Sequence, residues 1–173
     1  GIINFAYWMV KHGMTYQEPN LELIDEWAEA WSYSLIKASN KLAMEKGACP
    51  KTMETKYGQG ITPNQTYKED VDELVKHKER QDWKTLRKQL KDTGIRNSTL
   101  MALMPAETSA QISNSTNGIE PPRSYVSIKQ SKHGVLKQVV PGYPYYKNKY
   151  DLLWDQKSPQ GYLKIMSVLQ KYI

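Results

Sequence analysis

The feature that most constrains this sequence is an apolar stretch, residues 98–104, that carries no charge and is followed at once by a proline. An uncharged run of this length is typical of a β-strand buried on both faces. Pro105 ends the strand, and Thr108 with Gln111 three residues later is a capping-box pattern for a helix beginning near Ser109. The sequence therefore predicts a strand, a tight loop and a helix.

A loop of this kind can bind an anion. Unpaired backbone N–H groups and the positive end of the helix dipole point at the same spot, with the hydroxyls of Thr108 and Ser109 beside them. Phosphate groups are commonly bound in this way. The alternative is that Thr108 is only a helix cap, which is the more frequent role for such a residue. The motif by itself does not decide between the two interpretations.

Other helices are predicted from apolar residues spaced by about 3.6 positions and from capping residues. Asn20 and Gly47 bound a long helix whose apolar stripe includes Trp27 and Trp31, which we expect in the core. Alternating apolar residues predict a hairpin over 124–130 and 135–140, with the turn SKHG. The remaining predictions are a strand at 2–5 and helices at 6–11, 66–76 after the Thr66/Glu69 capping box, 83–93 after Asp82, 145–154, and from Pro159 after the cap Ser158.

The length suits one domain, but the predicted core is thin. The chain has 173 residues, and twelve of those counted in its 39% hydrophobic content are tyrosines. A complete soluble domain could still fold with this composition. A fragment that shares its core with another chain would show the same deficit. We treat residues 1–173 as a single partial domain.

The net charge of +6 is concentrated in residues 124–173, which hold eight lysines and two aspartates. A basic excess can indicate binding to nucleic acid or to a membrane surface. Here the lysines are spread among helix and hairpin positions, which favours a solvated face. The charged run 76–82, KHKERQD, is also most simply a solvated loop, although it is the best local candidate for a nucleic-acid contact.

Few residues suggest chemistry outside the loop. Cys49 is the only cysteine, so no internal disulfide can form and a reducing cytoplasmic location is expected. The sequence contains no signal-peptide pattern. It also contains no run of about 18 apolar residues, so no transmembrane segment is predicted. No metal site is predicted, because the three histidines, His12, His77 and His133, lack the spacing of metal ligands. No catalytic residue is predicted either, because the acidic pairs Asp25-Glu26 and Asp72-Glu73 are expected on outward, solvated faces.

A family resemblance extends over nearly the whole chain. The segment GIRNSTLMALMPAETSAQISNSTNGIEPPRSYVSIKQSKHGVLKQVVP is similar, without a gap, to the part of the class I ribonucleotide reductase large subunit that follows its central barrel strands. INFAYWMVKHG, SLIKASNKLAMEKGACP and TKYGQGITPNQTYK resemble the same family in the same order, and YDLLWDQKSPQGYLKIMSVLQKYI continues the match. The resemblance implies an α/β fold, here a mainly helical fragment of a ten-stranded α/β barrel with a β-hairpin.

The resemblance also implies a function for the loop. Pro105, Ala106, Glu107, Thr108 and Ser109 would hold the diphosphate of a ribonucleoside diphosphate substrate. Bacterial relatives often place a hydroxyl residue where this chain has Ala106, so one side-chain donor is missing while the backbone donors remain. A carboxylate so close to an anion costs energy, and we therefore expect the Glu107 side chain to turn away or to meet a ribose hydroxyl.

The same resemblance implies what this chain lacks. The radical-carrying cysteine, the redox cysteine pair, the tyrosine relay and the C-terminal shuttle cysteines have no counterpart here. The expected partners are therefore the remaining part of the large subunit, the small subunit, which holds the radical cofactor, and thioredoxin or glutaredoxin acting through the missing cysteines. No cofactor is expected in this segment. The alternatives are a basic nucleic-acid-binding module and a purely structural fragment.

Overall fold

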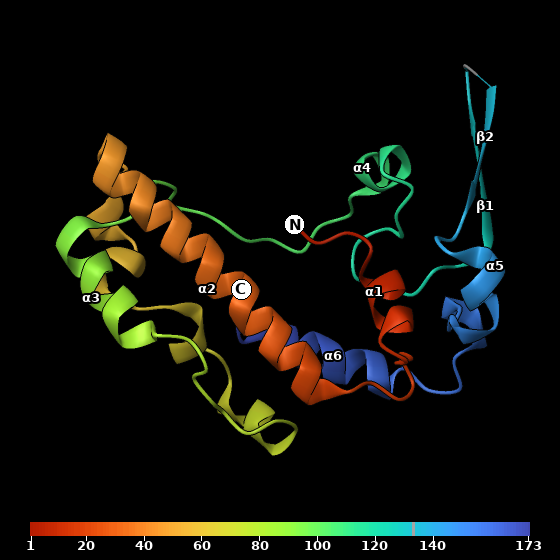
Figure 1. Ribbon diagram of the computed structural model, residues 1–173, viewed down its shortest axis with the longest axis horizontal. Helices are drawn as coiled ribbons and strands as arrows, with labels where there is room; N and C mark the ends of the chain where they lie inside the picture. The colour runs from red at the N-terminus through yellow and green to blue at the C-terminus, as the bar shows by residue number, and fades with distance from the viewer. Residues whose placement is uncertain (133) are drawn as a thin grey trace. The chain divides into compact units, whose positions relative to one another are not determined.

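The longest helix, α2 (Leu21–Lys46), begins directly after Asn20 and ends at Gly47, as the sequence predicts (Figure 1). The computed structural model describes residues 1–132 and 134–173, which divide into two units. We call Leu21–Met101 with Lys164–Ile173 the helical unit, and Gly1–Asn20 with Ala102–Leu163 the hairpin unit. The expectation of a single partial domain remains a prediction.

The core of the helical unit forms where α3 (Trp83–Thr93) packs against α2. Asp82 caps α3, because its Oδ1 accepts a hydrogen bond from the Thr85 backbone N–H at 3.1 Å. The three side chains of α3 predicted to face inward, Trp83, Leu86 and Leu90, are buried. They pack with Ile36 of α2 and with Ile95 and Met101, which follow α3 in the chain. The cap and the apolar spacing of this helix are therefore both confirmed.

The segment between α2 and α3 is built from short 3-10 turns. The predicted helix at 66–76 is wrong, because the capping box forms earlier, between Thr62 and Gln65, where the Thr62 N–H donates to Gln65 Oε1 at 3.1 Å. Only Val75 of its three predicted apolar positions is buried, so a longer helix would have little core to cover. The turns are η1 (Thr52–Glu54), η2 (Tyr57–Gln59), η3 (Pro63–Gln65) and η4 (Glu69–Glu73).

The buried face of α2 is more polar than its sequence predicts. Trp27 and Trp31 are only half-buried, and their rings lie parallel with centroids 6.1 Å apart. The fully buried stripe instead includes two carboxylates: Ile24, Asp25, Ala28, Glu29, Ser32, Ile36, Ser39, Asn40 and Ala43. Two buried acids on one helix face require cations close by.

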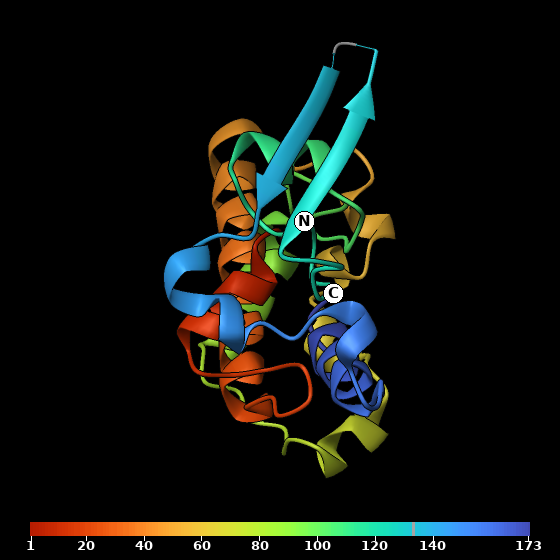
Figure 2. The ribbon, with the colours of Figure 1, turned by 90° about the vertical axis from the view of Figure 1, so that its right-hand side faces the viewer.

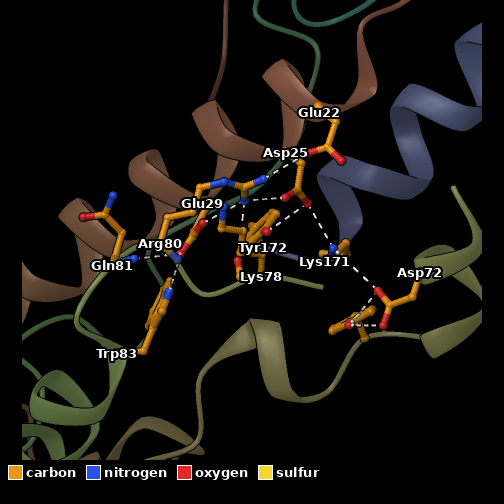
Figure 3. A network of polar contacts seen from close by, with 11 residues as sticks. Glu22, Asp25, Glu29, Asp72, Lys78, Arg80, Gln81, Trp83, Lys171 and Tyr172 are labelled. Carbon is orange, nitrogen blue, oxygen red and sulfur yellow. Dashed lines mark hydrogen bonds and ion pairs between the residues drawn. The ribbon is translucent and has the colours of Figure 1, made fainter. Parts of the chain in front are cut away.

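Arg80 supplies one of these cations, from the run that we expected to be a solvated loop (Figure 3). Its Nη1 donates to Asp25 Oδ2 at 2.7 Å and to Glu29 Oε2 at 3.1 Å. The other oxygen of Glu29 accepts from the indole N–H of Trp83 at 2.9 Å. The prediction that Asp25 is solvated is therefore wrong. The solvated loop predicted at 76–82 holds for the exposed residues 76–79 and 82, but not for Arg80.

The end of the chain supplies the second cation. Lys171 is fully buried, and its Nζ lies 3.0 Å from Asp25 Oδ1 and 3.7 Å from Asp72 Oδ1. Asp72 is half-buried, so the prediction that it lies on an outward face is wrong. Tyr172 donates to Asp25 Oδ1 at 2.9 Å. Burial, and then the Asp25 charge, raise the pKa of Tyr172, so this hydroxyl stays a proton donor. The helix α6 (Gln160–Gln170) leads to these residues and begins one residue after the predicted first position, Pro159, with Ser158 Oγ accepting from the Gln160 N–H.

The hairpin unit contains the predicted hairpin. Strands β1 (Val126–Ser131) and β2 (Gly134–Val139) pair antiparallel, with Val126 opposite Val139 and Ile128 opposite Lys137 (Figure 2). His133, which we placed in the turn, lies outside the described residues. The unit also contains α1 (Phe5–Lys11), α4 (Glu107–Ile112), α5 (Tyr143–Tyr146), η5 (Lys147–Lys149) and η6 (Leu153–Asp155).

Three predictions in this unit and at its border are wrong. Residues 98–104 form no strand, and Met101 is the one buried residue among them. The strand predicted at 2–5 is also absent, since Asn4 has a left-handed backbone with φ 67° and Phe5 already belongs to α1. The helix at 145–154 is replaced by the short turns α5, η5 and η6. A strand buried on both faces needs hydrogen-bonded neighbours, and within the described residues the sole ladder joins β1 to β2.

The fold prediction is thus confirmed in its mainly helical character and in its hairpin, and the described residues do not form a complete α/β barrel. Among the residues that the structure describes, no helix is both long enough and apolar enough to cross a membrane.

Candidate functional site

Helix α4, which follows the predicted loop, begins earlier in the chain than the sequence predicts. Helix α4 begins at Glu107 with Ala106 as its N-cap, so the predicted start near Ser109 and the capping box of Thr108 with Gln111 are wrong. Ala106 has no side-chain acceptor. The backbone N–H of Ala106 instead donates to the side-chain oxygen of Asn117 at 3.0 Å. This bond holds the loop at Pro105 and Ala106 against the turn that follows α4.

The first turn of α4 presents unused donors to solvent. The first helical hydrogen bond runs from the Ala110 N–H to the Ala106 carbonyl at 2.9 Å. In the part of the chain that the structure describes, no acceptor faces the N–H groups of Glu107, Thr108 and Ser109, nor the hydroxyls of the last two. All three residues are exposed. The five predicted residues therefore lie together in one exposed turn with several donors free for an anion.

The negative charge of Glu107 is neutralised from the hairpin. Its Oε2 forms an ion pair with the ammonium of Lys129 on β1. The hydrogen bond from Lys129, together with its positive charge, holds the pKa of Glu107 below the ordinary value, and Arg123 lowers it further. Because Lys129 pairs with the Glu107 carboxylate, that carboxylate repels an anion at the start of α4 less strongly.

Replacing Lys129 with methionine should raise the pKa of Glu107 toward that of an ordinary glutamate. Since the folded-state pKa is depressed, the ion pair contributes stability above the ordinary carboxyl pKa and loses it as the pH falls through the folded-state value. An NMR titration of the Glu107 side-chain carboxyl carbon measures this directly. Lys132→Met removes the same charge from the same hairpin and should leave the titration unchanged. An equal Glu107 pKa in parent and Lys129→Met would contradict the ion pair.

The hairpin is also tied to the far end of α4. The side-chain amide of Gln138 on β2 donates to the Ala110 carbonyl at 3.3 Å and to the Ser115 carbonyl at 3.0 Å. Hairpin, α4 and the turn after it together enclose a cavity of about 360 Å³. Its walls are largely apolar, with a few polar groups, which is the usual character of a ligand pocket. Among the lining residues are Thr116, Glu120, Pro121, Pro122, Val140 and Tyr162.

The sequence did not reveal the residues that support the loop. Lys129 and Gln138 lie 22 and 28 residues from their partners in the chain, and no local pattern indicates such contacts. Asn117, eleven residues from its partner Ala106, was not predicted to contact the loop. The hairpin register could have shown that Lys129 and Gln138 share a face. Gln138 lies opposite Ser127, and Lys129 is two residues further along the same strand, so both side chains leave the same side of the hairpin.

Other reactive side chains do not gather at a second site. In residues 1–132 and 134–173 no three His, Cys, Asp or Glu side chains are placed so that they could hold a metal ion. His12 lies with Nδ1 2.8 Å from the Trp8 carbonyl, and His77 stacks on Tyr67. Cys49 is partly buried against the core of the helical unit.

Comparison with known proteins gives a consistent result. The family model described as "Ribonucleotide reductase, barrel domain" matches residues 1–172. The chain is 53% identical over 174 aligned residues to ribonucleoside-diphosphate reductase 1 subunit alpha of Salmonella typhimurium and 52% identical to that of Escherichia coli. It is 42% identical over 175 to the alpha subunit of Enterobacteria phage T4. Each match covers the whole of this chain and 23% of the relative, so the chain spans about a quarter of the length of these proteins.

Proposed function

Because this chain belongs to the ribonucleotide reductase barrel-domain family, we propose that it is one part of the large subunit of a class I ribonucleoside-diphosphate reductase. The observation that carries the proposal is the match over the whole chain to subunits that bear this name. In the proposed assembly the rest of the large subunit and the small subunit are the partners, with thioredoxin or glutaredoxin as the external reductant. A cytoplasmic location is part of the same proposal.

The proposed reaction replaces the 2′-hydroxyl of a ribonucleoside diphosphate by hydrogen and releases that hydroxyl as water. The two electrons come from a pair of thiols that becomes a disulfide. This sequence contains one cysteine, Cys49, so both the thiol pair and the radical cysteine have to come from the rest of the subunit. In this proposal the small subunit supplies the radical and this segment holds no cofactor. The contribution of this chain is to position the substrate, which can provide a large part of a rate enhancement.

We assign the substrate diphosphate to the turn of Pro105, Ala106, Glu107, Thr108 and Ser109. Three free N–H groups at the start of a helix, with two hydroxyls beside them, match the acceptor oxygens of a diphosphate. The ion pair with Lys129 supports this assignment, because it reduces the repulsion that Glu107 would exert on the ligand. Ala106 contributes no side-chain donor, so most of the binding comes from the backbone.

Thr108→Ala should weaken the binding of a ribonucleoside diphosphate to the assembled enzyme by on the order of 1 kcal/mol, the typical contribution of one hydrogen bond. Isothermal titration measures this change. Thr85→Ala is the matched control, because Thr85 is also an exposed threonine in the first turn of a helix, α3. Equal affinities in Thr108→Ala and parent would remove the loop from the substrate site. No nucleotide binding at all would favour a purely structural fragment.

A further inference from the structure

Thr116 and Glu120 line the cavity under the hairpin, and each has one buried side-chain oxygen without a partner among the described residues. Thr116 is only 6% exposed, and its hydroxyl makes no hydrogen bond. Glu120 Oε2 is shielded from solvent and also makes none. An unpaired buried hydroxyl costs free energy, and an unpaired buried carboxylate oxygen costs more. Such atoms indicate that a hydrogen-bonding group normally occupies the cavity.

The backbone holds both groups in place. The N–H of Thr116 donates to Asn4 Oδ1 at 3.1 Å, and its carbonyl accepts from the Asn4 N–H at 2.9 Å. Glu120 folds back over Gly118, whose φ of 50° and close approach to Oε2 leave no room for a Cβ. Tyr16 donates its hydroxyl to the carbonyl of Ile119, next to Glu120, at 2.7 Å. The orientation of the two unpaired atoms is therefore set by the fold.

Glu120 is also the acid of the cavity wall that lacks a counter-ion in the described chain. Glu107 and Lys129 neutralise each other, and the positive charge of Arg123 acts on Glu107. Tyr162 faces the Glu120 charge, since its pKa is raised by burial and then by Glu120. No cation pairs with Glu120 in residues 1–132 and 134–173. A group that carries a positive charge and donates hydrogen bonds would satisfy both residues.

We propose that a cationic side chain of the large subunit, from a part outside this chain, enters the cavity and pairs with Glu120 and Thr116. An arginine fits best, because its planar fork can donate to a carboxylate and to a neighbouring hydroxyl at once. The prolines Pro121 and Pro122 offer an apolar wall for its stem, and about 360 Å³ is ample room. The relatives are about four times as long as this chain, so most of the subunit is available as donor. The inference rests on the proposed function, because it requires the assembled subunit.

Glu120→Gln should have opposite effects on the isolated chain and on the complex. In the isolated chain it removes a half-buried charge whose Oε2 has no partner, so hydrogen exchange of the amides around Thr116 and Glu120 should stay equal or slow. In the complex it leaves the incoming cation without a carboxylate, so the dissociation constant should increase by about tenfold to a hundredfold or more. Both are measured on the purified chain, alone and mixed with the companion chain or chains that carry the rest of the subunit. A merely structural role for Glu120 would lower both stability and affinity.

Two further variants sharpen the test. Glu18→Gln makes the same charge change at an exposed position of the same unit and should alter neither measurement. Thr116→Val removes only the hydroxyl and should raise the dissociation constant by about fivefold, the typical effect of one hydrogen bond. Unchanged association in Glu120→Gln, with tight binding of the parent, overturns the cavity assignment alone. No association between the parent chain and its companion overturns the assignment and the proposed function together.

Discussion

Replacing Arg80 with methionine is expected to lower the local stability of the helical unit by about 3–5 kcal/mol, the usual penalty for breaking a buried ion pair. Asp25 and Glu29 are 0% and 1% exposed, and Arg80 donates to both. Methionine fills similar volume but leaves Glu29 without a cation and Asp25 with Lys171 alone. The measurement is native-state hydrogen exchange of the α2 and α3 amides, which reports opening free energies even when global unfolding is not two-state.

Arg96→Met provides the control for this prediction. Arg96 is exposed and donates only to the Gly47 carbonyl, so its replacement should change exchange by no more than about 0.5 kcal/mol, as for an ordinary surface substitution. If the Arg80 and Arg96 variants exchanged alike, the network around Asp25 would contribute little to stability. A stabilised Arg80→Met variant would mean that the carboxylates become protonated or solvated without difficulty.

The second large effect is expected on mixing this chain with the rest of the large subunit. Alone, the chain should melt over a broad range, bind a hydrophobic dye and reduce no ribonucleoside diphosphate. The companion piece, with the small subunit and reductant, should restore a sharp transition and diphosphate reduction. The physical reason is exposed apolar surface on the hairpin, where Val126, Ile128, Val135 and Leu136 are 43 to 64% exposed. Residues 98–104 belong to no helix or strand, and no backbone hydrogen bond joins them to another segment of the described chain.

Each component assayed separately gives the control for the mixing experiment. Activity should require all of them, and dye binding should fall when the companion is added. A sharp, cooperative melt of the isolated chain together with no activity on mixing would refute this prediction and favour a self-contained binding module. Salt-dependent binding to single-stranded or duplex DNA would then identify that module as one that binds nucleic acid.

Local signals in the sequence were sufficient where structure depends on neighbours in the chain. The cap Asp82 with its apolar spacing predicted α3, Asn20 and Gly47 bounded α2, and alternation predicted the hairpin. Capping and periodicity act within one or two helical turns, so they can be read without knowing the fold. The failures at 66–76 and 145–154 have the same origin, because those segments bury too few apolar residues to pay for regular helices.

The sequence alone therefore determined the helices α2 and α3, the hairpin, the family resemblance and the loop from Pro105 to Ser109 as a candidate anion site. Only the tertiary structure decided the charge partners. It brought Arg80 and Lys171 to the buried acids of α2 and Lys129 to Glu107, and it left Glu120 Oε2 without a partner among the described residues. It also decided that residues 98–104 are not a strand. The physical reason is that ion pairs and β-ladders join residues far apart in the chain, and no local pattern specifies which distant group will complete them.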